Sequence, residues 1–303
     1  MRFGLMTGAD GRRHTLDDLI AFAQRAEAGG FDDLWMANVR AHDALMTLCF
    51  IGRATRQIRL GTAVTPTPPR HPSALAQQAL TAAAATNNRF SLGIGPSHKV
   101  VTEDMLGLTF AHPARHTREY LQVLMPLLRG EICNFEGQEY RIRGLQLDVP
   151  DAGPVPVFVA ALGPKMLELT GELADGTSTW MVGPKTMETH IVKTLHAAAT
   201  SAGRPIPQVV GGFPIVLTNN VDAARARLDK GLAIYGQLPS YRAMLDREGL
   251  KGPGDLALVG DEAQLRSDIA RIESTGVTHF NASIAAVESG AFDRTFDFLK
   301  SLR

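Results

Sequence analysis

A glycine-proline turn in this chain has the residue types of an anion-binding loop. In VAALGPKMLEL, Val159 to Leu169, small residues end an expected strand, and Gly163 and Pro164 stand where a helix should begin. A helix start leaves backbone N–H groups unpaired and carries the positive end of the helix dipole, which together favour phosphate. The turn is therefore either a phosphate site or an ordinary tight connection from strand to helix.

The segment GIGPSHK, Gly93 to Lys99, places a serine and a histidine after another expected strand. His98 takes the place of the third glycine of a dinucleotide fingerprint, so we reject that interpretation. Ser97 lacks the Gly-x-Ser-x-Gly context of a hydrolase nucleophile. A histidine with a pKa of about 6.5 can transfer a proton at physiological pH, so His98 is either a proton donor or a structural residue.

The other residues expected at strand ends are poor in catalytic groups. The segments concerned are Thr7–His14, Asn38–Asp43, Ala63–Pro72, Gly95–Val101, Ala161–Lys165, Val182–Pro184, Thr218–Asn220 and Ala285–Glu288. They contain no His-x-His pair, no cluster of three histidines or carboxylates and no pair of acids, so we predict no metal site. A cofactor that carries its own chemistry would explain this composition, because the protein then has only to bind and orient it. A hydrolase or lyase without a cofactor is the less favoured alternative.

These groups need a scaffold, and the hydrophobic pattern predicts one. Apolar runs of strand length alternate with amphipathic helical stretches. The expected strands are Phe3–Thr7, Asp33–Ala37, Ile58–Thr65, Phe90–Ile94, Val155–Ala160, Gly176–Met181, Gln208–Leu217 and His279–Ala285. Alternating units in a chain of 303 residues predict an α/β fold, a closed (β/α)8 TIM barrel with its site at the C-terminal strand ends.

The helices and two insertions complete the expected fold. The first helix should begin after Thr15, a good N-cap, and end at Gly29-Gly30. The pattern also predicts a hairpin at Asn134–Gly144, before strand five, and two extra helical segments within Tyr235–Ser274, between strands seven and eight. Later helices are expected near Lys165–Ala174, Lys185–Ser201, Asp222–Ile234 and Asp293–Leu302. No stretch has the composition of a linker, so residues 1–303 should form a single domain.

Charge and composition exclude several classes of partner. The chain has 31 Lys plus Arg residues and 31 Asp plus Glu residues, which argues against a nucleic acid or a membrane surface as partner. Its 2 cysteines, Cys49 and Cys133, are too few for a disulfide framework, and we expect inert thiols. The apolar start is shorter than a signal-peptide core, so we expect a cytoplasmic protein that binds a small molecule.

Several longer segments resemble a known family. They are FGLM (Phe3–Met6), LGTAVTPTPPRHPSALAQQALT (Leu60–Thr81), NNRFSLGIGPSH (Asn87–His98), RHTREYLQVLMPLLRGE (Arg115–Glu131), FEGQEYR (Phe135–Arg141), VAALGPKMLELTGELADGTSTWMVGP (Val159–Pro184) and YGQLPSYRAMLDREGL (Tyr235–Leu250). Together they are similar to the bacterial luciferase-like superfamily, and within it to the coenzyme F420-dependent (deazaflavin) oxidoreductases of actinobacterial type. The resemblance covers essentially the whole chain.

The resemblance implies which residues would hold the cofactor. It implies a non-prolyl cis peptide bond between Ala63 and Val64 that braces one face of the deazaflavin ring. It also implies polar contacts to the cofactor from Asn38, Thr65 and Ser97. The phosphate of the cofactor would bind at Ala160, Ala161, Leu162, Gly163, Pro164 and Lys165.

The resemblance also bears on proton transfer. Family members carry a histidine after strand two, and Val39 stands there in this chain. A polar or acidic residue near the reacting carbon maps onto His98, which makes His98 the preferred proton donor. The alternative donors lie in the loop of Arg40, His42 and Asp43.

The resemblance implies a function as well. The chain is expected to be an F420-dependent oxidoreductase that moves a hydride between C5 of the deazaflavin and a C=C, C=N, C=O or alcohol group of a small organic substrate. The alternatives are an FMN-dependent monooxygenase of the same superfamily and a non-catalytic flavin- or deazaflavin-binding protein. The resemblance further implies a homodimer. Four residues either line the substrate pocket or belong to the core: Trp180, Met181, Tyr235 and Tyr241.

Overall fold

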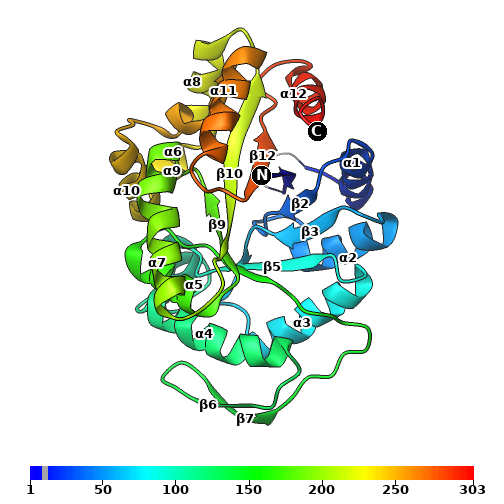
Figure 1. Ribbon diagram of the computed structural model, residues 1–303, viewed down its shortest axis with the longest axis vertical. Helices are drawn as coiled ribbons and strands as arrows, with labels where there is room; N and C mark the ends of the chain where they lie inside the picture. The colour runs from blue at the N-terminus through cyan, green and yellow to red at the C-terminus, as the bar shows by residue number, and fades with distance from the viewer. Residues whose placement is uncertain (9–12) are drawn as a thin grey trace.

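In residues 1–8 and 13–303, which the computed structural model describes, eight parallel strands close into a barrel (Figure 1). Each barrel strand pairs with the next one along the chain, and the last pairs with the first. The barrel strands are β1 (Arg2–Thr7), β2 (Asp33–Met36), β3 (Arg59–Thr62), β5 (Phe90–Gly95), β8 (Val157–Val159), β9 (Gly176–Trp180), β10 (Gln208–Leu217) and β12 (His279–Ile284). The predicted (β/α)8 TIM barrel is confirmed. Residues 9–12 of the expected strand-end segment Thr7–His14 lie outside the described residues.

Helices cover the outside of the barrel, where the strands present large apolar side chains. Leu5, Leu34 and Leu60 are at most 1% exposed in this layer. The longer helices are α1 (Leu16–Ala28), α2 (Ala44–Ala54), α3 (Pro72–Ala85), α4 (Pro113–Leu128), α5 (Pro164–Leu173), α7 (Lys193–Ser201), α8 (Val221–Gly231), α10 (Pro239–Glu248), α11 (Glu262–Glu273) and α12 (Ala291–Lys300). None of the helices in the described part of the chain is long and apolar enough to cross a membrane.

The first helix begins and ends where its capping residues predict. The Thr15 hydroxyl accepts a hydrogen bond from the backbone N–H of Asp18 at 3.1 Å, and the Asp18 carboxylate accepts one from that of Thr15 at 2.8 Å. The chain then turns at Gly30, whose φ of +78° lies in the left-handed region that glycine adopts without a steric penalty. This turn leads directly into β2.

Two expected helices differ from the structure, and one strand was not expected. The helix expected at Lys185–Ser201 is divided into α6 (Pro184–Thr186), a π-helical turn η2 (Met187–Val192) and α7. The helix expected at Asp222–Ile234 ends at Gly231, and a separate short helix α9 (Ala233–Gln237) follows. An unexpected strand, β11 (Leu258–Gly260), pairs with the end of β10. Because β10 extends beyond the end of β9, the last residues of β10 have no partner in β9 and pair with this extra strand instead.

The third barrel strand is interrupted where it reaches the mouth of the barrel. The expected strand Ile58–Thr65 forms as β3 and a short continuation, β4 (Thr65–Pro66), that pairs with the end of β5. Between them lies a cis peptide bond joining Ala63 and Val64, as the resemblance implied. At the interruption the Thr62 hydroxyl replaces the backbone ladder. It donates to the carbonyl oxygen of Gly93 at 2.7 Å and accepts from the N–H of the same residue at 2.9 Å.

Both insertions are present. The segment expected as a hairpin forms the antiparallel strands β6 (Cys133–Glu136) and β7 (Arg141–Leu145), which Figure 1 shows beyond α4 at the edge of the molecule. Between α8 and β12 the chain forms α9, α10, a 3-10 turn η3 (Pro253–Leu256), β11 and α11. The helices α9 and α10 lie beside α6 at one side of the barrel (Figure 1).

One buried carboxylate holds the hairpin against α4. Glu119 is 8% exposed and accepts hydrogen bonds from the backbone N–H groups of Gln138, Glu139 and Tyr140 at 3.0, 2.7 and 3.3 Å. A Cβ atom at Gly137 would lie 2.3 Å from the carboxylate, so only glycine fits there. The hairpin turn therefore depends on an acceptor from another element.

Replacing Glu119 with glutamine is expected to lower the free energy of unfolding by about 2 to 3 kcal/mol, because its NH2 group would face backbone donors that cannot pair with it. Urea unfolding followed by circular dichroism measures this change. The matched control is Glu136→Gln, whose ion pair with Arg141 has partners 62% and 64% exposed. An exposed pair of this kind contributes little, so the control should shift stability by less than about 0.5 kcal/mol. Equal losses in the two variants would contradict the role given to Glu119.

Candidate active site

The C-terminal strand ends form a mouth above a closed barrel interior. Below the mouth, the ring of Trp35 packs edge-on against Phe158 with centroids 5.3 Å apart, and a Cβ atom at Gly61 would lie 2.4 Å from that ring. Above it, Ala63 and Ala160 are only partly buried although both belong to barrel strands or their ends. Solvent therefore reaches this end of the barrel, where the side chains of Ala63 and Ala160 are small.

Val64 covers the floor of the mouth on the β5 side. A Cβ atom at Gly95 would lie 2.7 Å from a methyl group of Val64 and 3.1 Å from the Cβ atom of Ala160. At Gly93 it would lie 1.9 Å from the carbonyl oxygen of Thr62. Both glycines are thus required for the close approach of the third strand. The predicted cis bond is confirmed, and the contact of Ala63 and Val64 with a cofactor stays a prediction.

The predicted polar contacts differ in their availability. Asn38 is half-buried, and its side-chain oxygen accepts a hydrogen bond from the N–H of Ala44 at 2.8 Å, which leaves its amide N–H groups for a ligand. Thr65 is fully buried, and its hydroxyl has no hydrogen-bond partner among the described residues. The contact of Thr65 with a cofactor stays a prediction. Ser97 is half-buried with a φ of +66°, a left-handed conformation that is uncommon for serine.

His98 lies half-buried at the end of β5, next to an aromatic ring of the insertion. Its ring centroid is 5.8 Å from that of Tyr241 in α10. Burial lowers the pKa of His98 below its ordinary value of 6.5, because desolvation disfavours the imidazolium form. Its carbonyl oxygen accepts hydrogen bonds from Val101 and Thr102 at 3.0 and 2.8 Å, which fixes the backbone at this position.

The other histidines singled out by the sequence have structural partners. His71 is the N-cap of α3, and its Nδ1 lies 2.7 Å from the Ser73 hydroxyl. His116 lies 3.0 Å from the hydroxyl of Thr67 through Nε2. His42, in the loop of alternative donors, lies 3.0 Å from the carbonyl oxygen of His14. These contacts support structural roles.

The predicted phosphate turn can be compared with a second turn of the same sequence. Gly-Pro-Lys occurs at residues 163–165, before α5, and again at residues 183–185, before α6. At the second turn, the carboxylate of Glu248 accepts hydrogen bonds from the N–H groups of Lys185 and Thr186 at 3.1 and 2.8 Å. A Cβ atom at Gly183 would lie 2.3 Å from that carboxylate. The chain's own anion therefore fills the second turn.

The first turn is open. No atom lies within 4 Å of a Cβ atom placed at Gly163, and no side chain caps the start of α5. The preceding carbonyl oxygen, that of Leu162, is held by Nε2 of His190 at 2.8 Å. Lys165 is exposed. The turn thus offers N–H groups at the positive end of a helix together with a cationic side chain.

A row of four aromatic side chains borders the mouth, and we call it the aromatic row. His98 contacts Tyr241, whose ring centroid lies 4.9 Å from that of Tyr235, which in turn lies 6.3 Å from that of Trp180. His98 comes from the segment after β5 and Trp180 from the end of β9, and the two tyrosines come from α10 and α9. Sequence reasoning left the tyrosines divided between pocket and core, and the structure brings them to His98. Sequence reasoning missed Glu248: the repeated Gly-Pro-Lys sequence marks the turn that it fills but does not indicate which carboxylate fills it.

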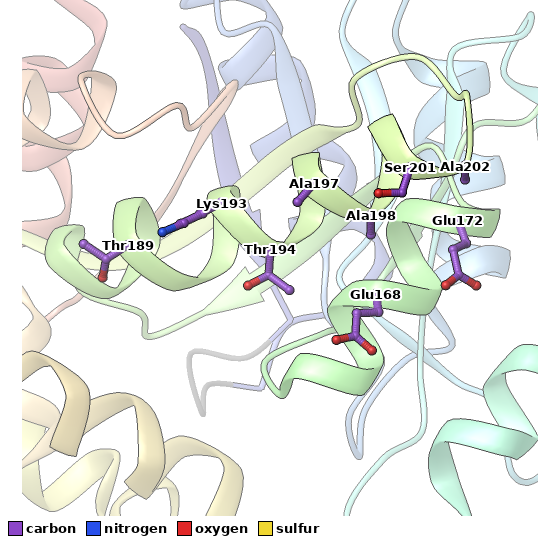
Figure 2. A pocket seen from close by; sticks show the side chains of 9 residues that line it. All are labelled: Glu168, Glu172, Thr189, Lys193, Thr194, Ala197, Ala198, Ser201 and Ala202. Atoms are coloured by element: carbon purple, nitrogen blue, oxygen red, sulfur yellow. The ribbon is translucent and has the colours of Figure 1, made fainter.

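A separate surface groove lies between α5 and α7, on the outside of the barrel. Figure 2 shows Glu168 and Glu172 on one side of it and Lys193 and Thr194 on the other. The groove is bordered further by Thr189, Ala197, Ala198, Ser201 and Ala202. It is not part of the mouth, because its residues belong to the outer helices. Within the described residues, no group of three His, Cys, Asp or Glu side chains could hold a metal ion.

Comparison with known proteins complements this geometry. A family model described as luciferase-like monooxygenase matches residues 1–279. A 5,10-methylenetetrahydromethanopterin reductase from Methanolobus tindarius is 32% identical over 207 residues, 68% of this chain, and the match spans 63% of that relative's length. A putative coenzyme F420-dependent oxidoreductase from Mycobacterium tuberculosis is 26% identical over an alignment of 337 positions that covers 95% of this chain and 96% of the relative.

A solved structure is similar over almost the whole chain. The coenzyme F420-dependent tetrahydromethanopterin reductase from Methanopyrus kandleri superposes with a TM-score of 0.83, covering 99% of this chain and 97% of its own. The two sequences are 21% identical in that comparison, so the likeness concerns the fold.

Proposed function

This chain belongs to the luciferase-like monooxygenase family, and from that premise we propose that it is a coenzyme F420-dependent oxidoreductase. The observation that carries the proposal is the open Gly163–Lys165 turn beside a barrel mouth lined by small residues, in contrast to the filled turn at Gly183. A ring with a phosphate-bearing tail needs both features. The reductases and the F420-dependent oxidoreductase among its relatives support the choice of F420.

Each part of the site has a task in this proposal. Ala63 and Val64 would brace the ring, and the amide group of Asn38 would donate to its polar edge. The residues from Ala160 to Lys165 would hold the phosphate. When bound, F420 supplies or accepts a hydride at C5 of its deazaflavin. The imidazole of His98, which is half-buried against Tyr241, would transfer the accompanying proton.

FMN is the alternative cofactor, and one observation favours it. The family description names monooxygenases, and FMN also combines a flat ring with a phosphate. The open turn before α5 fits the phosphate of either molecule. An FMN-dependent monooxygenase is therefore the second candidate, and it would consume oxygen when supplied with reduced FMN.

Binding of the two cofactors separates the candidates. We expect purified protein to bind F420 at least about tenfold more tightly than FMN, as measured by quenching of the intrinsic fluorescence of each cofactor. Oxygen uptake with reduced FMN is the companion measurement and should stay at the background rate. Tighter binding of FMN, with oxygen consumption, would replace the first candidate by the second. A protein that binds either cofactor but turns over no acceptor would be a binding protein.

We also propose a homodimer. On α2, Met46 and Phe50 are 62% and 49% exposed and lie one helical turn apart, so they form an apolar stripe on the surface. A second copy of the chain could cover them. Size-exclusion chromatography with light scattering tests this proposal, and a monomer at micromolar concentration would overturn it.

A further inference from the structure

The insertion between β10 and β12 supplies two members of the aromatic row. Tyr235 and Tyr241 come from α9 and α10, and they connect His98, which follows β5, with Trp180 of β9. The row is backed by the buried side chains of Met181, Leu245 and Leu256. The four rings of the row are each partly exposed, and the rings of Trp180, Tyr235 and Tyr241 rest on this apolar support.

The row offers neutral hydrogen-bond donors. Burial raises the pKa of both Tyr235 and Tyr241 above the ordinary tyrosine value of 10.0, so the two hydroxyls stay protonated at physiological pH. Burial lowers the pKa of His98 below 6.5, which favours its neutral form. No ion pair between described residues involves a member of the row. A charged ligand would lose hydration here without gaining a partner, whereas a flat uncharged ring would stack.

The position of Tyr241 is fixed from the far end of its helix. Glu248 lies seven residues after Tyr241, about two turns, so the two side chains share one face of α10. The carboxylate of Glu248 is bound at the start of α6, where the hydroxyl of Thr186 also donates to it at 2.6 Å. Leu245, on the same face and 1% exposed, packs into the core beneath the row. These contacts of Glu248 and Leu245 hold α10 in place, and with it Tyr241 beside His98.

We propose that the aromatic row is the acceptor pocket of the enzyme and that it selects a planar, uncharged, conjugated carbonyl compound. This rests on the proposed function. In the reaction, the C–H bond at C5 of the reduced coenzyme breaks and its hydride forms a C–H bond at the conjugated C=C of the acceptor. The electron pair of that double bond moves to the carbonyl oxygen, which takes a proton from the imidazolium form of His98 and leaves the imidazole neutral. The acceptor is reduced by two electrons and the coenzyme is oxidised by two.

The test uses a flat ligand that cannot be reduced. Isothermal titration calorimetry of the full chain without cofactor should show 2-naphthol binding at least about tenfold more tightly than its saturated counterpart decahydro-2-naphthol. In Tyr241→Ala the affinity for 2-naphthol should fall about tenfold, and in Tyr241→Phe by less, because the ring remains. The matched control is Arg247→Ala, on the exposed side of the same helix, which should bind 2-naphthol as the wild-type protein does.

The F420 affinity of every variant is measured alongside by fluorescence quenching. Unchanged F420 binding in Tyr241→Ala shows that the variant is folded, and a selective loss of 2-naphthol then supports the acceptor pocket. Equal affinity for the flat and saturated alcohols, or a loss of F420 rather than 2-naphthol, overturns it. A wild-type protein that does not bind F420 overturns the proposed function, whichever result the naphthol titration gives.

Discussion

Replacing His98 with alanine is expected to lower kcat by about 100-fold to 10,000-fold, the range that a positioned proton donor contributes. The affinity for F420 should stay within about threefold, because the imidazole is assigned to the acceptor side of the mouth. The assay is oxidation of reduced F420 with menadione, a planar conjugated acceptor, followed by the return of F420 absorbance. The control is His112→Gln, an exposed histidine at the start of α4 that caps no N–H group.

The pH profile gives an independent readout for His98. Burial lowers its pKa below 6.5, and the donor is the protonated form. The rate of acceptor reduction should therefore be highest at low pH and fall as the pH rises through a value below 6.5. In the direction of alcohol oxidation the neutral form is the base, so the slope reverses. If His98→Gln keeps both the rate and this pH dependence, the proton comes from elsewhere, and the loop of Arg40, His42 and Asp43 becomes the place to look.

Replacing Gly163 with aspartate should weaken F420 binding by about 100-fold to 1,000-fold. A carboxylate beside the phosphate turn would repel the phosphate of the ligand, and two like charges a few ångströms apart near a protein surface cost about 3 to 4 kcal/mol. Dissociation constants from fluorescence quenching measure the effect. The expected loss should shrink as salt concentration rises, because exposed charges are screened.

The matched control for this variant is Gly163→Ala. No atom lies within 4 Å of the Cβ atom that alanine adds, and Gly163 has a φ of −82°, so alanine fits there without strain. Its F420 affinity should equal that of the wild-type protein. If aspartate is tolerated as well as alanine, the phosphate binds outside residues 160–165, and the anion site of the proposal is misplaced.

Local patterns predicted the parts of this molecule that depend on neighbouring residues. The N-cap at Thr15, the hairpin at Asn134–Gly144 and the barrel itself follow from spacing and turn chemistry within short segments. The cis bond between Ala63 and Val64 came from the resemblance to a family and is confirmed. No local signal would have indicated it.

Contacts between distant segments escaped prediction. The carboxylate of Glu248 fills a turn 62 residues before it, and three N–H groups of a hairpin depend on Glu119 in another element. In both cases a backbone group needed an acceptor, but the sequence alone does not say which carboxylate supplies it. The pairing of His98 with Tyr241 is of the same kind, since it requires α10 to be placed over the mouth.

At the end of β3, the hydroxyl of Thr62 keeps the barrel wall closed although the backbone leaves the ladder with β5. Elsewhere in the barrel, the backbone hydrogen bonds between strands both close the wall and fix the position of the residues that line its interior. Where β3 ends, a side chain bonds to both polar groups of Gly93, and the backbone is released to follow another course. The wall between β3 and β5 therefore stays bonded at Thr62, while Ala63 and Val64, which follow it, are positioned independently of the β3–β5 backbone ladder.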